Sequence, residues 1–420
     1  MRSLTLINPP SPWLISDRVE VPLGMLYLAS FLRESGAEIK LLDLSGSKFN
    51  EKYVLPESDI YGIGFVSPQA IYAKEILNKI NKEKPNFPII AGGVHSTSIP
   101  EHSLSLGFDA VIKGEGEKST LQILKEGIKK KVYDLDFISS LDDLPSPAWD
   151  LIDMESYISD LGVVGYMKNN QNFQREINVM GTRGCTGKCA YCTEYKGPLR
   201  WRSTEKIIKE LNVLREKYNV NRFFFVDDNL VINKRWLGGL TKKLKEEEIK
   251  WHCLGRADQV DYKICKEMVD SGCMGIDFGI ESGSQKILNI IKKDTTVQRQ
   301  EEGIKSAYEA GLRVRAQFMV GLPQEEEEDH KKNLEFIEKN INYVSKWGIH
   351  IFVPFPSCEI WRKPESFDYY INKNTDFSNF QTIGKPGEWN FVPVEKQEII
   401  ARRREEILNK INEKNIFKTV

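Results

Sequence analysis

Apolar and polar positions alternate along the first 130 residues in the pattern of parallel β/α units. Short apolar runs predict strands, at 4–8, 38–43, 59–66, 88–91 and 109–113. Between them, apolar residues at helical spacing predict helices over 22–35 and 70–84. Strands that alternate with helices favour a doubly wound parallel sheet, an α/β fold whose ligands bind at the carboxyl ends of the strands.

The loops that follow these strands leave the backbone open to a ligand. They carry small or turn-forming residues, which let another molecule approach closely. The positions concerned are Asn8 and Pro9, Ser67, Gly92, Gly93 and His95, and Gly114, Glu115, Gly116 and Glu117. Ordinary turn chemistry explains any single loop equally well, but four such loops at four strand ends favour a binding edge.

The alternation stops over 132–160, where acidic residues and prolines predict a crossing between domains. It then resumes with longer units. Strands are predicted at 177–182, 222–226, 250–255, 274–280, 312–320 and 348–353, with helices such as 204–218 and 299–310 between them. Six units are too few for a full (β/α)8 barrel. They suffice for a partial, TIM-like (β/α)6 barrel with its chemistry at the carboxyl ends of the strands.

These patterns divide the chain into four parts. They are a Rossmann-type domain over 1–132, a linker over 133–172, a partial barrel over 173–360 and a C-terminal extension over 361–420. The extension contains a charged helix at 394–412, which we expect to be a solvated face.

Composition and charge narrow the function classes. The 420 residues carry 59 basic and 60 acidic side chains, so the net charge is −1. Nucleic-acid binding needs a concentrated basic surface, and this balance argues against a nucleic-acid partner. No apolar run approaches the ~20 residues of a membrane-spanning helix, and the first residues do not resemble a signal peptide. The sequence therefore predicts a cytoplasmic protein without a membrane span.

Three of the seven cysteines are clustered, with the spacing Cys185-x₃-Cys189-x₂-Cys192, directly after the first barrel strand. A structural zinc site needs four ligands, and the other cysteines form no second pair with suitable spacing. A [4Fe–4S] cluster usually takes four thiolates. Held by only three, it leaves one iron open to a small ligand, as a reaction centre requires. An incomplete zinc knuckle and chance clustering are the alternatives.

This loop resembles the CxxxCxΦC signature of the radical S-adenosylmethionine (radical SAM) enzymes, with Tyr191 at the aromatic position. The resemblance implies that the three cysteines hold three irons of a [4Fe–4S] cluster and that S-adenosylmethionine chelates the fourth. One-electron reduction by an external ferredoxin or flavodoxin then splits S-adenosylmethionine to methionine and a 5′-deoxyadenosyl radical, which abstracts hydrogen from a substrate.

The strand ends of the barrel supply further candidate contacts to S-adenosylmethionine. Asp227 or Asp228 stands where the family often has a Gly-Gly-Glu motif that binds the amine of S-adenosylmethionine. The alternative is that the two aspartates are solvated and cap the next helix. Arg256 is a candidate for holding a carboxylate. Glu281 lies in a segment that resembles the border of the nucleoside site, and it could accept from ribose hydroxyls. Arg315 lies in a stretch that resembles the family's fifth strand, where a salt bridge explains it equally well.

Residues 1–130 resemble the cobalamin-binding domain that precedes many radical SAM barrels. The resemblance rests on the loops described above and on the segment 22–29, which contains Leu23 and Gly24. It implies that cobalamin binds at this edge. The chain lacks the Asp-x-His-x-x-Gly motif whose histidine ligates cobalt, and so matches the fused subclass in which no histidine does so. For His95 we expect a place near the tail of the cofactor rather than on the cobalt.

The resemblance implies a cobalamin-dependent radical SAM enzyme, most simply a methyltransferase acting on an unactivated carbon or a phosphinate-like phosphorus. The alternatives are a cyclisation or rearrangement, with cobalamin in another role or lost, and a cobalamin or cluster sensor. Methylthiotransferases that modify tRNA are disfavoured because residues 1–184 contain no cysteine for their second cluster. Cys358 is predicted near the barrel mouth, as a hydrogen donor or substrate contact, although a buried inert thiol explains it better.

Overall fold

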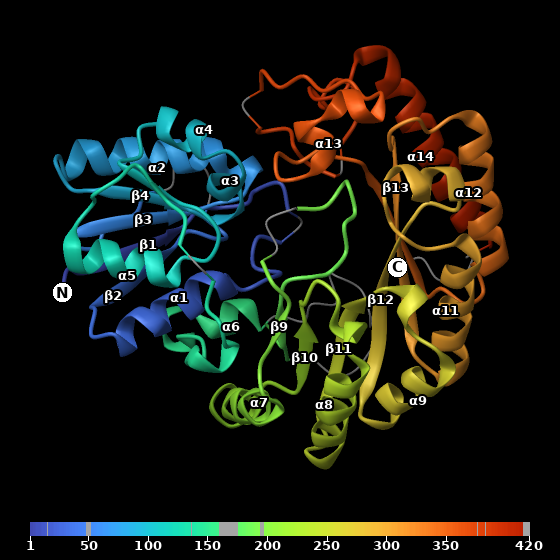
Figure 1. Ribbon diagram of the computed structural model, residues 1–420, viewed down its shortest axis with the longest axis horizontal. Helices are drawn as coiled ribbons and strands as arrows, with labels where there is room; N and C mark the ends of the chain where they lie inside the picture. The colour runs from blue at the N-terminus through green and yellow to red at the C-terminus, as the bar shows by residue number, and fades with distance from the viewer. Residues whose placement is uncertain are drawn as a thin grey trace.

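The computed structural model describes residues 1–14, 16–47, 52–135, 137–158, 175–193, 197–375, 377–382 and 384–414. Within them the chain forms two six-stranded parallel sheets, each flanked by helices (Figure 1). The predicted α/β fold with two sheets is confirmed. The predicted end of the linker and start of the barrel, over 159–174, lie outside the described residues, as does the predicted tail after 414. No helix in these ranges is long and apolar enough to cross a membrane.

The N-terminal sheet has the strand order β2-β1-β3-β4-β5-β6. Its strands are β1 (Leu4–Asn8), β2 (Ile39–Asp43), β3 (Ile60–Gly64), β4 (Ile89–Gly92), β5 (Ala110–Ile112) and β6 (Val132–Tyr133). The order reverses direction between β1 and β3, which is where doubly wound sheets bind ligands.

Helices cover both faces of this sheet (Figure 1). One face carries α1 (Leu23–Glu34) and α5 (Glu117–Glu126), and the other carries α2 (Ala70–Glu83), α3 (Gly93–Ser98) and α4 (Pro100–Ser105). Each face buries its own apolar cluster. Because both faces are covered, the strands read as continuous apolar runs in the sequence.

Strand β6 is absent from the sequence prediction. It pairs with β5, so the sheet extends past the predicted boundary at 132. A two-residue strand is too short to give a periodic signal. The crossing that follows is packed rather than loose, because helix α6 (Met154–Tyr157) joins the buried cluster of the barrel and the Tyr157 hydroxyl donates to Asp43 Oδ2 at 2.6 Å.

The second sheet, with the order β14-β13-β12-β11-β10-β7, is an open partial barrel. Its strands are β7 (Glu176–Val179), β10 (Arg222–Phe225), β11 (Lys250–Gly255), β12 (Cys273–Glu281), β13 (Arg313–Val320) and β14 (Lys346–Ile351). The helices between them are α7 (Thr204–Tyr218), α8 (Lys234–Glu246), α9 (Tyr262–Asp270), α10 (Gln285–Ile290), α11 (Val297–Ala310) and α12 (Glu327–Asn340).

The first predicted barrel strand, 177–182, is divided in the structure. Strand β7 ends at Val179, and an antiparallel ribbon of β8 (Thr182–Arg183) and β9 (Arg200–Trp201) follows. The Asp227 carboxylate accepts the backbone N–H of Gly181 at 3.0 Å and that of Thr182, which turns the chain out of the sheet. The cysteine loop emerges between the two strands of this ribbon.

The C-terminal extension contains α13 (Glu359–Arg362) and α14 (Val394–Lys414). The prediction that the charged helix is a solvated face was wrong. Ile400 and Ile407 are buried in the barrel core, and α14 contacts α12 and β14. These isoleucines recur at helical spacing behind the charged residues that dominate this stretch of sequence.

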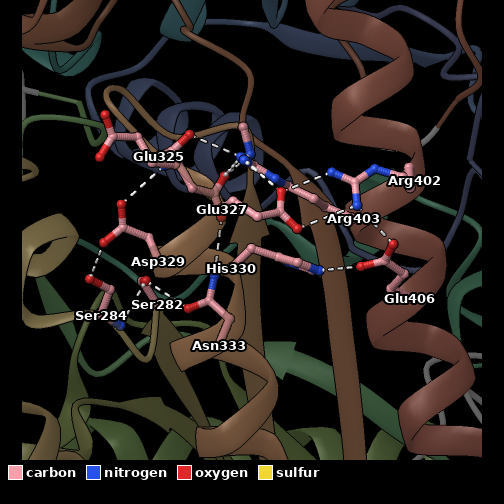
Figure 2. A network of polar contacts seen from close by, with 12 residues as sticks. Ser282, Ser284, Glu325, Glu327, Asp329, His330, Asn333, Arg402, Arg403 and Glu406 are labelled. Atoms are coloured by element: carbon pink, nitrogen blue, oxygen red, sulfur yellow. Dashed lines mark hydrogen bonds and ion pairs between the residues drawn. The ribbon is translucent and has the colours of Figure 1, made fainter.

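Polar contacts fix α14 to the barrel (Figure 2). Arg403 Nη1 donates to the backbone oxygen of Glu325 at 2.9 Å, and His330 Nε2 lies 2.6 Å from Glu406 Oε2. The Glu325 carboxylate accepts in turn from the Gly321 N–H at 2.6 Å. Helix α14 is therefore an integral part of the barrel wall.

Candidate functional site

A cavity of about 700 Å³ lies where the carboxyl edges of the two sheets face each other. From the first domain it is lined by most of the predicted cobalamin contacts, which are Asn8, Leu23, Gly24, Gly92, Gly93, Gly114, Glu115, Gly116 and Glu117. From the barrel it is lined by Asn178, Thr182, Gly184, Thr193, Asp227 and Asp228, among others. Gly184 and Thr193, which flank the three cysteines in the sequence, therefore share one space with the loops of the N-terminal sheet.

The wall on the N-terminal side requires glycine at position 93. Its φ is +87°, and a Cβ atom there would lie 2.7 Å from the backbone nitrogen of Phe65. Next to it, Val66 and Val94 are 41% and 53% exposed. Neither valine is among the predicted cobalamin contacts, although each adjoins one of them. Together they offer an apolar surface that a large flat ligand would cover.

Several buried polar atoms on the cavity wall have no hydrogen-bond partner among the described residues. They are the Tyr27 hydroxyl, Thr120 Oγ1, Asn178 Nδ2 and Thr182 Oγ1. Leaving such atoms unpaired is costly, so the wall suits a ligand with its own amide donors and acceptors. Cobalamin, a large ring bordered by amide side chains, fits this combination. No histidine is found among the described lining residues.

His95 lies behind this wall, and with Ser67 and Pro9 it is not among the lining residues. It is fully buried, with Nδ1 3.0 Å from Ser67 Oγ and Nε2 2.9 Å from His102 Nδ1. Burial, together with the charge of His102, lowers the pKa of His95 to about 3. Both ring nitrogens of His95 are therefore engaged within the protein, while its neighbours Gly93 and Val94 line the cavity.

Glu115 and Glu117 line the cavity, but their carboxylates are engaged by arginines of the barrel. Glu115 accepts from Arg200 at 2.6 and 3.0 Å, and Glu117 accepts from Arg183 Nη1 at 2.9 Å. Arg183 Nη1 also lies 3.2 Å from Glu115. Both glutamates are predicted cobalamin contacts, whereas neither arginine was predicted, since nothing in the local pattern shows that the two segments meet.

The cysteine loop places its first two thiols on either side of Gly187. The Gly187 N–H donates to Cys185 Sγ at 3.3 Å, and a Cβ atom at 187 would lie 3.8 Å from Cys189 Sγ. Cys192 closes a turn by donating its N–H to the carbonyl of Cys189 at 3.1 Å. All three cysteines are partly exposed.

The described part of the loop shows no ready-made site for a single metal ion. Within the described ranges, no three His, Cys, Asp or Glu side chains converge on one point. A [4Fe–4S] cluster spreads its thiolates over separate irons, so it does not require that convergence. Partly exposed cysteines on a compact loop therefore fit a cluster better than a structural zinc ion.

Tyr191 contacts one of the other predicted residues, Glu281, and also a lysine that the sequence analysis missed. The Tyr191 hydroxyl donates to Glu281 Oε1 at 2.8 Å, and Lys293 Nζ lies 2.8 Å from the same oxygen and 3.1 Å from the hydroxyl. Lys293 is 4% exposed and Glu281 is 8% exposed. A lysine in a charged surface-like segment gives no sequence signal of such burial.

The two aspartates after β10 have different environments. Asp227 is buried and holds the turn at Gly181 and Thr182. Burial raises its pKa to about 6 against the effect of these hydrogen bonds. Asp228 also lines the cavity but is exposed. Only Asp228 therefore presents a carboxylate that is free of these backbone contacts.

The two predicted arginines are held by neighbouring carboxylates. Arg256 donates to both oxygens of Asp258, at 2.9 and 2.8 Å, while its Nη1 lies 3.9 Å from Cys189 Sγ. Arg315 Nε lies 3.2 Å from Asp277 Oδ1 on the adjacent strand. The salt-bridge interpretation of Arg315 therefore has a specific partner, and Arg256 borders the thiols of the loop.

Cys358 lies beside the cysteine loop, with no exposed surface. Thr193 and Cys358 form an antiparallel bridge, and Cys358 Sγ accepts the N–H of Trp361 at 3.3 Å. Burial raises the pKa of this thiol to about 12. Its contacts are those of a packed thiol at the start of α13.

The fold and the site define a class of radical enzyme. In this class a partial barrel with three cysteines on its first loop meets a doubly wound domain at a shared cavity. The sequence model of the Radical SAM superfamily matches residues 179–337, and that of the B12 binding domain matches residues 17–124. An uncharacterized methyltransferase of Pyrococcus horikoshii is 30% identical over 393 residues, covering 85% of this chain and 82% of the relative. The chain belongs to the cobalamin-binding-domain-containing radical SAM enzymes. The predicted family and its cofactors, a [4Fe–4S] cluster, S-adenosylmethionine and cobalamin, are confirmed.

Other relatives are named as methyltransferases or as a cyclase. The cytidylyl-2-hydroxyethylphosphonate methyltransferase of Streptomyces wedmorensis is 26% identical over 397 residues, covering 77% of this chain and 73% of the relative. The anaerobic magnesium-protoporphyrin IX monomethyl ester cyclase of Rubrivivax gelatinosus is 25% identical over 386 residues, covering 83% and 68%. The structure of the radical SAM methyltransferase TsrM from Kitasatospora setae has a TM-score of 0.66 at 14% identity, covering 86% of this chain and 74% of that chain. At this identity the likeness shows the fold.

Proposed function

We propose that this enzyme transfers a methyl group to an unactivated carbon of a small molecule or peptide. The shared cavity carries the proposal, because the loops of the N-terminal sheet and the ends of the cysteine loop line it together. When bound, cobalamin supplies the methyl group, and the cluster with S-adenosylmethionine supplies a radical that removes a hydrogen atom from the substrate. The relatives named as methyltransferases support this reaction.

Within this site we assign the contacts to S-adenosylmethionine residue by residue. Asp228, exposed and on the cavity wall, binds the amine, while Asp227 holds the turn before the cysteine loop. Glu281 accepts from the ribose, and Arg256 orients the loop beside Cys189. The apolar wall around Val66 and Val94 excludes water from the reacting groups.

The proposal includes an external one-electron reductant of the ferredoxin or flavodoxin class and a cytoplasmic location. All seven cysteines are free thiols, as in proteins of reducing compartments. It also retains the division of the chain into a cobalamin-binding domain over 1–132, a linker over 133–172, a barrel over 173–360 and an extension over 361–420.

A cyclisation is the second candidate, because a cyclase is among the relatives and aligns with 83% of this chain. The two reactions differ in the fate of the methyl group of S-adenosylmethionine. A methyltransferase incorporates it into product, and a cyclase does not.

The test is anaerobic reconstitution with iron, sulfide and hydroxocobalamin. We expect four irons and one cobalamin per chain, and 5′-deoxyadenosine on reduction with S-adenosylmethionine. Methyl-labelled S-adenosylmethionine incubated with fractionated small-molecule extract should then yield a labelled product. Four irons without bound cobalamin would refute methyl transfer by this route, and product formation without label would favour the cyclisation.

A further inference from the structure

Lys293 is a buried lysine that the proposed chemistry does not use. It follows α10 in a segment whose neighbours are exposed, yet it is itself 4% exposed. Taking an ammonium group out of water is expensive unless charged and hydrogen-bonding partners compensate. Its partners are Glu281 Oε1 at 2.8 Å and the Tyr191 hydroxyl at 3.1 Å. One partner ends a barrel strand and the other lies inside the cysteine loop.

The backbone around Lys293 is held in an unusual conformation. Lys292 and Asp294 both have a φ of +53°, in the left-handed region that side chains disfavour. The carbonyl of Lys293 accepts from Arg256 Nη2 at 2.7 Å, and Arg256 Nη1 approaches Cys189 Sγ. The side chain of Lys293 therefore contacts the cysteine loop directly. Its backbone carbonyl is linked to the same loop through Arg256.

Glu281 is strained in the same way. Its φ is +69°, and the pairing of β12 with β13 shifts register between Gly279 and Glu281. Gly279 lies beneath the carboxylate, and a Cβ atom there would displace Glu281 Oε1 from its present position. Strained residues persist where the surrounding structure fixes them, and they cluster at binding sites.

These contacts leave one oxygen of Glu281 for a ligand. Both hydrogen bonds to its side chain end on Oε1, and within the described residues Oε2 has no partner. An ammonium has three donors, of which Lys293 uses two in these contacts. The contacts of Lys293 with Glu281 and Tyr191 therefore hold the carboxylate beside the cysteine loop. They leave Oε2 of Glu281 and one N–H of Lys293 available to a ligand.

We propose that Lys293 is a positioning residue of the S-adenosylmethionine site, which locks Glu281 and Tyr191 together so that the β12 bulge and the cysteine loop keep one geometry. The proposal rests on the function proposed above, because it takes Glu281 as a contact of S-adenosylmethionine. Lys293 acts through Glu281 and Tyr191, and its loss disturbs binding of S-adenosylmethionine while the thiols still hold the cluster.

The test compares reconstituted K293M with the wild-type holoenzyme. Iron content should remain at four per chain, while the dissociation constant for S-adenosylmethionine should rise about 10- to 100-fold, as for partners that orient a ligand-binding group. The change that S-adenosylmethionine causes in the electron paramagnetic resonance spectrum of the reduced cluster should be weakened or lost. K293R, which keeps the charge and the donors, should restore part of the affinity.

K292M is the matched control, because Lys292 is the adjacent residue but is exposed and paired with Glu359. It should bind S-adenosylmethionine as the wild type does. If K293M fails to fold because the buried Glu281 carboxylate loses its only cationic partner among the described residues, the double variant K293M/E281Q removes both charges and should show the same loss of affinity. Wild-type affinity in either folded variant, or loss of iron from K293M, would overturn the proposal. Absence of binding in the wild type would instead refute the proposed function.

Discussion

Arg183 Nη1 lies 2.9 Å from Glu117 Oε1, and this ion pair joins the stem of the cysteine loop to the cobalamin-binding domain. Arg183 ends β8 two residues before Cys185, and Glu117 begins α5. The pair is nearly sealed from water, with side-chain exposures of 15% and 3%. The position of the cysteine loop relative to the first domain is therefore set partly by electrostatic contacts at the cavity wall.

Removing this arginine should destabilise the protein strongly. R183M leaves the Glu117 carboxylate buried without its partner, which costs about 3–5 kcal/mol of unfolding free energy. Urea unfolding of the apoprotein measures the loss. R33M is the control, because Arg33 pairs with Asp150 at an exposed site, where a pair contributes about 1 kcal/mol or less. Equal effects of the two substitutions would contradict the importance of the buried pair.

The two aspartates after β10 should separate in their effects. D228N should weaken binding of S-adenosylmethionine, because it removes the exposed carboxylate from the cavity wall, and should leave stability unchanged. D227N should instead destabilise the apoprotein by about 1–3 kcal/mol, because an amide offers one acceptor oxygen where the carboxylate now serves the N–H groups of Gly181 and Thr182. Equilibrium binding and urea unfolding of both variants check this, and reversed effects would refute the assignment.

Glycine 93 should be required for cobalamin binding. G93A forces a Cβ atom against the Phe65 backbone at 2.7 Å, so it should distort the cavity wall and abolish or greatly reduce retention of cobalamin. G36A is a matched control, because Gly36 has a similar φ of +89° but open space around it. The control should cost only about 1 kcal/mol of stability and should retain cobalamin. Cobalt analysis after gel filtration measures retention; full retention in G93A would contradict the assigned wall.

The buried carboxylate behind α12 should make stability pH-dependent. Burial raises the pKa of Glu325 from its ordinary value of 4.5 to about 7. The folded protein then holds a proton that the unfolded chain releases, so the stabilisation is complete below pH 4.5 and is lost as the pH rises to about 7. In the wild type, the free energy of unfolding should fall by an amount of order 3 kcal/mol over this pH range. E325Q removes the titrating group, so this fall should be smaller.

Urea unfolding of the apoprotein at several pH values between 5 and 8 tests the Glu325 prediction. E327Q is the control, because Glu327 lies only two residues further along the chain and the hydrogen bonds from Arg402 hold its pKa at about 2. Its titration falls outside the window, so the pH dependence should match that of the wild type. An unchanged slope in E325Q would show that Glu325 does not titrate there.

Most features that depend on a single helix or strand, such as its type and its bounds, could be predicted from the sequence. Strand β11 has its predicted bounds, Lys250–Gly255, as does helix α7 at Thr204–Tyr218, because periodicity and caps are local signals. The spacing of the cysteines led directly to the family. The glycine loops were likewise sufficient to place the binding edge, since parallel strands bring their carboxyl ends together whatever their side chains.

Features that depend on contacts between distant segments were not predictable. The imidazole of His95 is chemically able to bind a metal or cofactor. Only the three-dimensional structure shows that Ser67 and His102 contact both of its ring nitrogens. Lys293 is buried by partners 12 and 102 residues away in the sequence. Helix α14 has a charged surface pattern, and the isoleucines that bury it are a minority of its residues.

The docking of α14 has a consequence for synthesis of the chain. Arg403 reaches back 78 residues to the Glu325 carbonyl, and Ile400 covers the turn at Gly321. The N-terminus leaves the ribosome first during synthesis, so the cobalamin-binding domain can fold while the barrel still lacks helix α14. Nascent chains that stop before residue 394 expose this apolar surface, and they should depend on chaperones more than complete chains do.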